Sequence, residues 1–153
     1  MPRSSAVSRA ALLLAAVVAV DQLTKALVRA GVDLGSKDGV FPGLEIVHVR
    51  NRGVAFGAFA GQPVVMAVVL AALAGLLVWF VLHRHRPHVW LPTGLLLGGA
   101  LGNIVDRLRD GYVTDWLKIP LWPSFNLADV FIVAGVIVLL WVLERGDGAE
   151  RAA

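Results

Sequence analysis

Four aspartates of the sequence lie at or near the ends of long apolar runs: Asp21, Asp106, Asp115 and Asp129. Two aspartates held close together away from water cannot both ionise easily, so one pKa rises and the pair shares a proton. The ionised member can then take a proton from water while the neutral member donates one to a scissile carbonyl. These residues predict hydrolysis by a carboxylate pair, but their types alone do not choose which two aspartates form it.

Other catalytic chemistries find less support. The chain has no cysteine, which excludes disulfides, thiol catalysis and thiolate metal sites. Ser36 and Ser124 have no histidine partner that the sequence orients, so serine catalysis is poorly supported. His83, His85 and His88 share a short arginine-rich link that holds no carboxylate, which does not favour a metal site. We therefore expect neither a metal ion nor a cofactor.

Two of the acids also have simple structural explanations. Asp21 and Lys25 are spaced i,i+4 in the favourable acid-first order, and such a pair can just neutralise itself on a helix face. Asp106 can form a buried ion pair with the nearby Arg107 or Arg109. Both interpretations stay open beside a functional one.

The remaining two acids differ from each other. Asn126 and Asp129 fit a helix N-cap followed by an acid at the third helical position, which stabilises a helix start and is compatible with a second role. Asp115 interrupts an apolar stretch and has no capping or helical-pair explanation in the local sequence. A functional role is therefore hardest to avoid for Asp115.

The composition indicates an integral membrane protein. Of 153 residues, 58% are hydrophobic and only 16% are charged, more apolar surface than one soluble core of this size can hide. The formal net charge of +3 could indicate nucleic acid, but the basic residues lie between apolar runs rather than along one polar face. We expect a lipid environment and no nucleic-acid partner.

The apolar runs predict an all-α membrane protein with four transmembrane helices in a single domain, residues 1–153. A span needs about 20 helical residues. The predicted spans are residues 10–28, 64–82, 89–107 and 127–143. The first could also be a signal peptide, but polar residues follow it at once without a clear cleavage site, so we expect an uncleaved helix.

Two longer connections, residues 29–63 and 108–126, separate the spans on one side of the membrane. Residues 44–50 alternate in the manner of a strand, and Arg52-Gly53 indicates a turn that leads into residues 54–57. A small β-containing segment between the first two helices is therefore expected on the membrane surface. Residues 108–126 mix aromatic residues with prolines and indicate an irregular interfacial segment.

The basic residues of the short 83–90 link predict the orientation. Their density places this link, and with it both chain termini, in the cytoplasm. Trp79, Trp90 and Trp141 fall at the same predicted membrane boundary, as interfacial tryptophans do. The acids and amides then meet at the opposite, outer face, because the ends of the first and third helices adjoin the starts of the second and fourth. Ionisable groups at membrane depth are costly, so this convergence favours a functional site.

Five short motifs occur in order within this frame. They are Asp21-Gln-Leu-Thr-Lys25, Asn51-Arg-Gly-Val-Ala-Phe-Gly57, Gly98-Gly-Ala-Leu-Gly-Asn103-Ile-Val-Asp106-Arg107, Val113-Thr-Asp115 and Phe125-Asn-Leu-Ala-Asp129. Together they resemble the bacterial lipoprotein signal peptidase (signal peptidase II) family, from about residue 10 to residue 143. Val54, where alanine is more usual, is a conservative departure from the second motif.

The resemblance implies an aspartic endopeptidase of the bacterial cytoplasmic (inner) membrane that removes the signal peptide from prolipoproteins just before their diacylglyceryl-modified cysteine. It implies that Asp115 and Asp129 are the catalytic dyad. The residues implied to line the site or contact substrate are Asn51, Gly102, Asn103, Arg107 and Asn126. Those implied to support it are Asp21, Lys25 and Asp106. It also implies inhibition by the cyclic peptide globomycin, and we expect the protein to act as a monomer.

Two other classes of function use the same residues differently. A small ion-coupled transporter would use buried acids as a relay, but it would distribute them across the membrane and would place charges or breaks in the second helix. A structural assembly factor would tolerate neutral substitutions at both Asp115 and Asp129.

Overall fold

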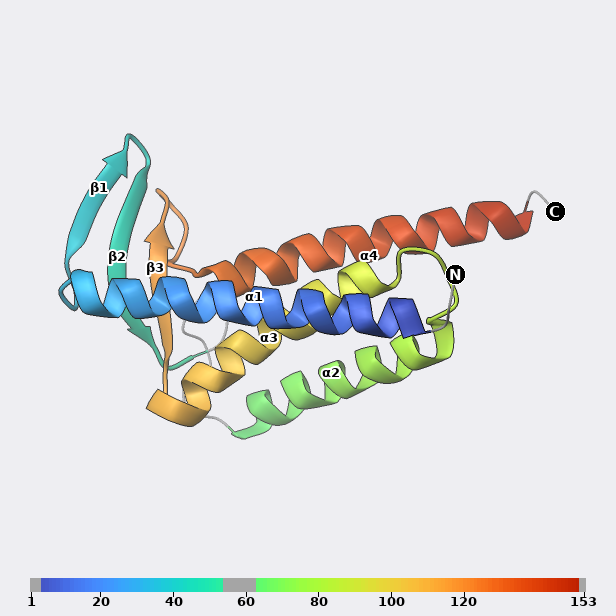
Figure 1. Ribbon diagram of the computed structural model, residues 1–153. Helices are drawn as coiled ribbons and strands as arrows, with labels where there is room; N and C mark the ends of the chain where they lie inside the picture. Colours follow the sequence, from blue (N-terminus) through green and yellow to red (C-terminus); the bar gives the residue numbers. More distant parts are fainter. Residues whose placement is uncertain (1–3, 54–62, 152–153) are drawn as a thin grey trace.

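The computed structural model describes residues 4–53 and 63–151, which form four long helices and one small sheet (Figure 1). The helices are α1 (Ser4–Gly31), α2 (Pro63–His83), α3 (Trp90–Asp110) and α4 (Leu127–Arg151). The strands are β1 (Lys37–Phe41), β2 (Leu44–Asn51) and β3 (Val113–Lys118). The prediction of a mostly helical chain with four helices is confirmed for the described residues, and residues 54–57 lie outside them.

The helices are longer than the predicted spans. Helix α1 begins at Ser4, and α4 continues to Arg151. Helix α3 ends at Asp110 and is capped by Gly111, whose φ of 74° is the left-handed conformation that favours glycine and whose N–H donates to the Arg107 carbonyl at 3.0 Å. The polar residues at the C-terminal ends of α1 and α3 are therefore part of the helices, which continue to the segments that carry the sheet.

Two of the described helices are long and apolar enough to cross a membrane, judged by length and composition. The qualifying stretches are Ala6–Gly31 of α1 and Leu127–Arg145 of α4. Helix α2 contributes a shorter apolar stretch, Ala67–His83.

The distribution of polar and apolar side chains is the reverse of that in a soluble protein. Leu12, Leu27 and Leu140 are each more than 60% exposed on the outer helix surfaces, whereas Asp21 and Lys25 are completely buried. Lipid can solvate exposed leucines, and charged groups inside a membrane protein face the protein interior. This arrangement fits a membrane environment.

Glycines on α3 allow it to pack tightly between α1 and α4. A Cβ atom at Gly98 would lie 2.8 Å from Cβ of Val17 on α1, and one at Gly99 would lie 2.6 Å from the Ala128 carbonyl oxygen on α4. Small residues at helix contacts are typical of membrane bundles, where close packing replaces the hydrophobic effect. Helices α1, α3 and α4 form a closely packed group on which the polar site is built.

The three strands form one antiparallel sheet in the order β1-β2-β3. Strand β2 confirms the strand predicted at residues 44–50, and it pairs with β1 through a hairpin turn in which Gly43 has a φ of 90°. The prediction that residues 108–126 are irregular is wrong for β3. This strand comes from the second of the two longer connections and pairs with β2, with Asp115 opposite Val49. The sheet therefore joins the two connections, because the backbone groups of β2 find partners in both.

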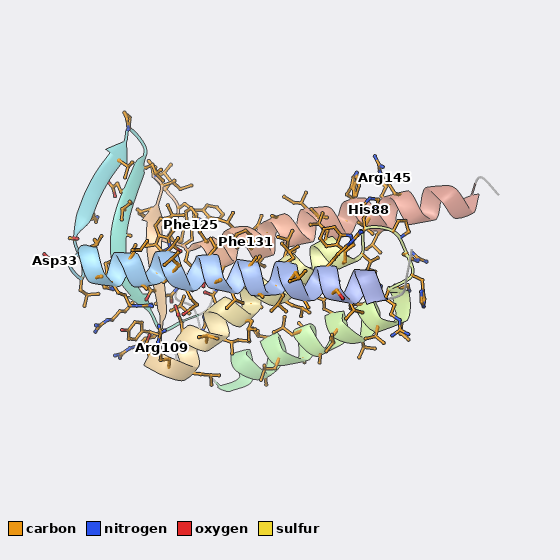
Figure 2. The ribbon with its side chains drawn as sticks, in the orientation of Figure 1. Asp33, His88, Arg109, Phe125, Phe131 and Arg145 are labelled. Atoms are coloured by element: carbon orange, nitrogen blue, oxygen red, sulfur yellow. The ribbon has the colours of Figure 1, made fainter. Side chains whose placement is uncertain are left out.

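The molecule has two chemically different ends (Figure 2). Asp33 and Arg109 lie at the end that carries the sheet, and His88 and Arg145 lie at the other. At this second end the His88 and Trp141 rings meet edge to face, with centroids 5.9 Å apart. The 83–90 link thus lies beside the later part of α4, as antiparallel helices require.

Candidate active site

Asn126 links the two aspartates that the family resemblance selects. It directly precedes α4 and is completely buried. Its side-chain Nδ2 donates to Asp115 Oδ1 at 2.8 Å, and its backbone N–H donates to Asp129 Oδ2 at 3.2 Å. One residue therefore contacts both carboxylates, which places Asp115 and Asp129 on either side of it.

Asp115 is held on strand β3 with only 2% of its surface exposed. Its second oxygen, Oδ2, accepts a hydrogen bond from Asn51 Nδ2 at 2.9 Å, since Asn51 ends the neighbouring strand β2. Removal from water raises the pKa of the Asp115 carboxyl to about 6 against the lowering effect of the Asn51 hydrogen bond, and the Asp129 charge adds to the rise. Asp115 is thus suited to carry a proton near neutral pH.

Asp129 lies at the third position of α4, where the predicted N-cap is confirmed. The Asp129 backbone N–H donates to Asn126 Oδ1 at 3.1 Å, which reciprocates the bond that Asp129 Oδ2 receives. The Asn103 amide Nδ2 donates to Asp129 Oδ1 at 2.9 Å. Both oxygens of Asp129 therefore accept hydrogen bonds at the start of the helix.

Asn103 connects Asp129 to a buried ion cluster. Its Oδ1 accepts from Lys25 Nζ at 2.9 Å and from Asn126 Nδ2 at 3.2 Å. The amide therefore has its oxygen toward two donors and its nitrogen toward Asp129.

The ion cluster consists of Asp21, Lys25 and Asp106, all completely buried. The Lys25 Nζ lies 2.8 Å from Asp21 Oδ2, which confirms the predicted i,i+4 pair, and 3.1 Å from Asp106 Oδ2. The closest ionic partner of Asp106 is thus Lys25. The predicted pair with Arg109 is also present, with Arg109 Nη2 3.5 Å from Asp106 Oδ1, although this half-exposed side chain lies closer to Asp110, at 2.8 Å.

Arg107 turns toward the dyad instead of toward Asp106. Its Nη2 donates to the Gly53 carbonyl at 2.8 Å, and its Nη1 donates to the Asn103 carbonyl at 3.3 Å. Gly53 N–H in turn donates to Asn51 Oδ1 at 2.9 Å, which forms the turn predicted after β2. Arg107 therefore ties the end of β2 to α3 beside the carboxylates.

Gly102 is required by the close approach of α3 to Asp21. A Cβ atom at Gly102 would lie 2.6 Å from Asp21 Oδ2. The Gly102 carbonyl accepts from Gln22 Nε2 at 3.1 Å. Gly102 thus supports the ion cluster through the packing of α1 against α3.

A pocket of about 630 Å³ opens directly onto the dyad. Its lining includes the polar residues Asn51, Asn103, Arg107, Asp115 and Asp129. Apolar residues of α4 and of the loop before it line its walls, among them Val130, Val133, Ile137, Trp122 and Phe125. Figure 2 shows Phe125 at the sheet end of α4. The pocket can hold a substrate with one polar and one apolar part.

The structure brings together every residue that the sequence singled out for the site, and it adds three. Gln22 Nε2 donates to Asp106 Oδ1 at 2.9 Å. Arg29 Nη1 donates to Thr114 Oγ1 at 3.1 Å, and the Thr114 N–H donates to Asp106 Oδ2 at 3.1 Å. Gln22 and Thr114 lie within the sequence motifs quoted above, directly beside Asp21 and Asp115, so the sequence could have identified both as site residues. Arg29 gave none, because only the fold brings it to β3.

The part of the chain that the structure describes contains no cluster of side chains suited to bind a metal ion. Within residues 4–53 and 63–151, no three His, Asp or Glu side chains gather in a way that could hold a metal ion. The polar groups around the dyad are instead bonded to one another.

Comparison with known proteins identifies the family. A family described as signal peptidase (SPase) II matches residues 13–144. The lipoprotein signal peptidase of Moorella thermoacetica is 44% identical over 91% of this chain and 95% of its own length. That of Halothermothrix orenii is 38% identical over 86% and 94%. A solved bacterial membrane enzyme superimposes with a TM-score of 0.81 at 29% identity, over 89% of this chain and 87% of its own. With five motifs in order and a match that spans nearly its whole length, the chain belongs to the signal peptidase II family.

Proposed function

We propose that this protein removes the signal peptide from prolipoproteins just before their diacylglyceryl-modified cysteine, with Asp115 and Asp129 as its catalytic dyad. The observation that carries the dyad assignment is the position of Asn126, which donates to both carboxylates that line the pocket. Family membership supports the substrate class. It also gives no support to an ion-coupled transporter or to an assembly factor.

In the proposed reaction, Asp129 is the general base and Asp115 the general acid. Asp129 takes a proton from a water molecule, whose oxygen attacks the scissile carbonyl carbon. Asp115 gives its proton to the carbonyl oxygen, so the product of this step is a neutral gem-diol. When the gem-diol collapses, the C–N bond breaks, Asp129 returns its proton to the leaving amine, and Asp115 recovers one from the diol. Both carboxyls are then restored.

The roles follow from the different surroundings of the two acids. Asp129 lies at the start of α4, lines the pocket and accepts hydrogen bonds from Asn103 and Asn126, as a proton acceptor should. Asp115 is removed from water, and its raised pKa of about 6 keeps a protonated fraction available near neutral pH. A pair with divided environments is the usual arrangement for acid and base work by two carboxyls.

We further propose that the chain forms a single domain with four membrane spans in the bacterial inner membrane. Both termini then lie in the cytoplasm and the dyad lies at the outer face. The α4 wall of the pocket continues into exposed apolar residues such as Val133 and Ile137, each about 60% exposed. The diacylglyceryl chains can remain in lipid along this wall while the peptide bond reaches the dyad. A globomycin-type cyclic peptide would compete for the same pocket, and one monomer contains the whole site.

The proposal is tested by cleavage of a lipidated prolipoprotein with purified wild type, Asp115→Asn and Asp129→Asn. We expect both variants to insert into membranes normally and to leave the substrate uncleaved. Asp33→Asn is the matched control, because Asp33 is exposed at the sheet end away from the pocket lining and its variant should cleave normally. An unlipidated substrate tests the lipid requirement. Full processing by both dyad variants would show that the assignment is wrong.

A further inference from the structure

We propose that the buried Asp21–Lys25–Asp106 cluster is a positioning device for the dyad, with one arm that fixes Asp129 through Asn103 and another that fixes Asp115 through Thr114. This inference rests on the proposed function, since it concerns the same two carboxylates. It gives separate tasks to Lys25 and Asp106, neither of which lines the pocket itself.

The first arm runs from Lys25 to Asp129. A lysine ammonium can only donate hydrogen bonds, so the Asn103 side chain must turn its oxygen toward Lys25 Nζ, 2.9 Å away. This choice leaves the Asn103 amide nitrogen facing Asp129 Oδ1 at 2.9 Å. A flipped amide would set its NH₂ group against the ammonium and its oxygen against the carboxylate, which are two repulsive contacts. Lys25 therefore fixes the direction from which Asp129 receives its donor.

The second arm runs from Asp106 to Asp115. Asp106 Oδ2 accepts the backbone N–H of Thr114 at 3.1 Å, one residue before Asp115 on β3. The same oxygen lies 3.1 Å from Lys25 Nζ. Arg29 holds the Thr114 side chain through Oγ1 at 3.1 Å. The C-terminal parts of α1 and α3 thus hold β3 at Thr114, and this contact fixes the position of the neighbouring Asp115.

The ammonium of Lys25 is the common point of both arms. It contacts Asp21, Asp106 and Asn103, and no part of its side chain is exposed. Burial of three charged groups carries a large desolvation cost that their mutual attraction offsets only in part, and apolar residues often stabilise a fold as well or better. A buried ion cluster is therefore explained better by the geometry that it specifies than by stability. The geometry specified here is that of the dyad.

The test compares steady-state kinetics of Lys25→Met with those of wild type, in detergent-purified full-length protein with a lipidated prolipoprotein. We expect kcat to fall about 100-fold, which is the effect of moving a catalytic group by about 1 Å, with KM changed less than about threefold. The pH profile gives a second readout. Because the Lys25 charge lowers the pKa of Asp115, its loss should move the falling limb of kcat/KM to higher pH. A residue that only held the fold would change neither kcat per folded molecule nor the position of this limb.

Two further variants keep the test decisive. Lys25→Met leaves Asp21 without its cation, so Asp21→Asn/Lys25→Met serves as a charge-balanced form with the same expected loss of kcat. Lys37→Met is the matched control, because Lys37 is exposed on β1 and should leave kcat unchanged.

For the second arm, Asp106→Ala should lower kcat strongly. Asp106→Asn should recover part of the loss, because an amide oxygen can still accept the Thr114 N–H.

The outcomes separate this inference from the proposed function. If wild type does not cleave the lipidated substrate, or if Asp115→Asn cleaves it, the proposed function itself is wrong. If both behave as proposed but folded Lys25→Met retains the wild-type kcat, or changes only KM, the positioning inference alone is overturned. Failure of both Lys25 variants to give folded protein would also overturn it, because the cluster would then hold the fold and not the dyad.

Discussion

Asn126 and Asp129 cap each other at the first turn of α4. The Asn126 backbone N–H donates to Asp129 Oδ2 at 3.2 Å, and the Asp129 backbone N–H donates to Asn126 Oδ1 at 3.1 Å. One side-chain oxygen of the proposed base is therefore also the group that satisfies a helix-start N–H. The first turn of α4 therefore contributes both to the stability of the helix and to the proposed catalysis, and substitutions can separate the two contributions.

Asn126→Ser should separate the two roles. Serine can still accept the Asp129 N–H and cap α4, so we expect the free energy of unfolding to stay close to that of wild type. It cannot replace the Nδ2 donor to Asp115, so kcat should fall at least tenfold. Asn126→Ala loses both roles and should also cost about 0.5–2 kcal/mol of stability. Thermal unfolding and prolipoprotein cleavage measure the two effects, and a fully active Asn126→Ser would contradict the bridging role.

The pH dependence of kcat/KM should reveal Asp115 as the proton donor. The pKa of its carboxyl in the free enzyme is raised to about 6, so the neutral form that donates predominates below this pH and is lost above it. We expect kcat/KM to decline above about pH 6, approaching tenfold per pH unit. Asp33→Asn should show the same profile. A rise through pH 6 to a plateau would instead make Asp115 the base and reverse the roles proposed for the dyad.

Gly102→Ala should destabilise the protein and reduce its activity. The new Cβ atom would lie 2.6 Å from Asp21 Oδ2, so either the carboxylate or α3 must move. Overpacking of this kind costs about 1–3 kcal/mol. Gly75→Ala on α2 is the matched control, because a Cβ there meets nothing within 4 Å and helix propensity favours alanine. Thermal unfolding of the two purified variants tests the difference, and an equal response would remove the argument for close approach at Gly102.

Ala134→Leu should lower the cleavage efficiency with lipidated substrate, because the larger side chain narrows the pocket on its α4 side. Ala134 lines the pocket, so three added carbon atoms should lower kcat/KM by about tenfold or more, mainly through KM. Val136→Leu is the control, because Val136 is exposed on α4 and does not line the pocket. Michaelis–Menten measurements on both variants decide the point. Equal effects on the two would place the substrate elsewhere.

The helical frame was predictable because long apolar runs are strong signals. The Asp21–Lys25 pair and the Asn126 cap were also predictable, since both depend on helical neighbours three or four residues apart. In each case the partners are close in sequence, so local geometry alone brings them together.

The third strand and the partner of Asp106 were not predictable in the same way. Strand β3 is six residues long, stands between two helices and finds its partner more than 60 residues earlier, so nothing local distinguishes it from an interfacial loop. Asp106 has Arg107 and Arg109 beside it in sequence, yet Lys25 reaches it because glycines bring α3 against α1. Local order indicated the pair with Arg109, and helix packing added the closer ion pair with Lys25.

The loop between β3 and α4 is closed at its base by a short bridge. Leu117 and Phe125 exchange backbone hydrogen bonds at 2.8 and 2.9 Å, so the seven residues between them leave and re-enter the fold at one fixed point. Asp115 and Asn126 lie outside this closure, whereas Trp122, part of the loop, faces the pocket. Changes of length or sequence within the loop can thus reshape what the pocket accepts while the proposed catalytic residues stay in place. Exchange of this loop between relatives is therefore the simplest way to alter substrate selectivity without rebuilding the site.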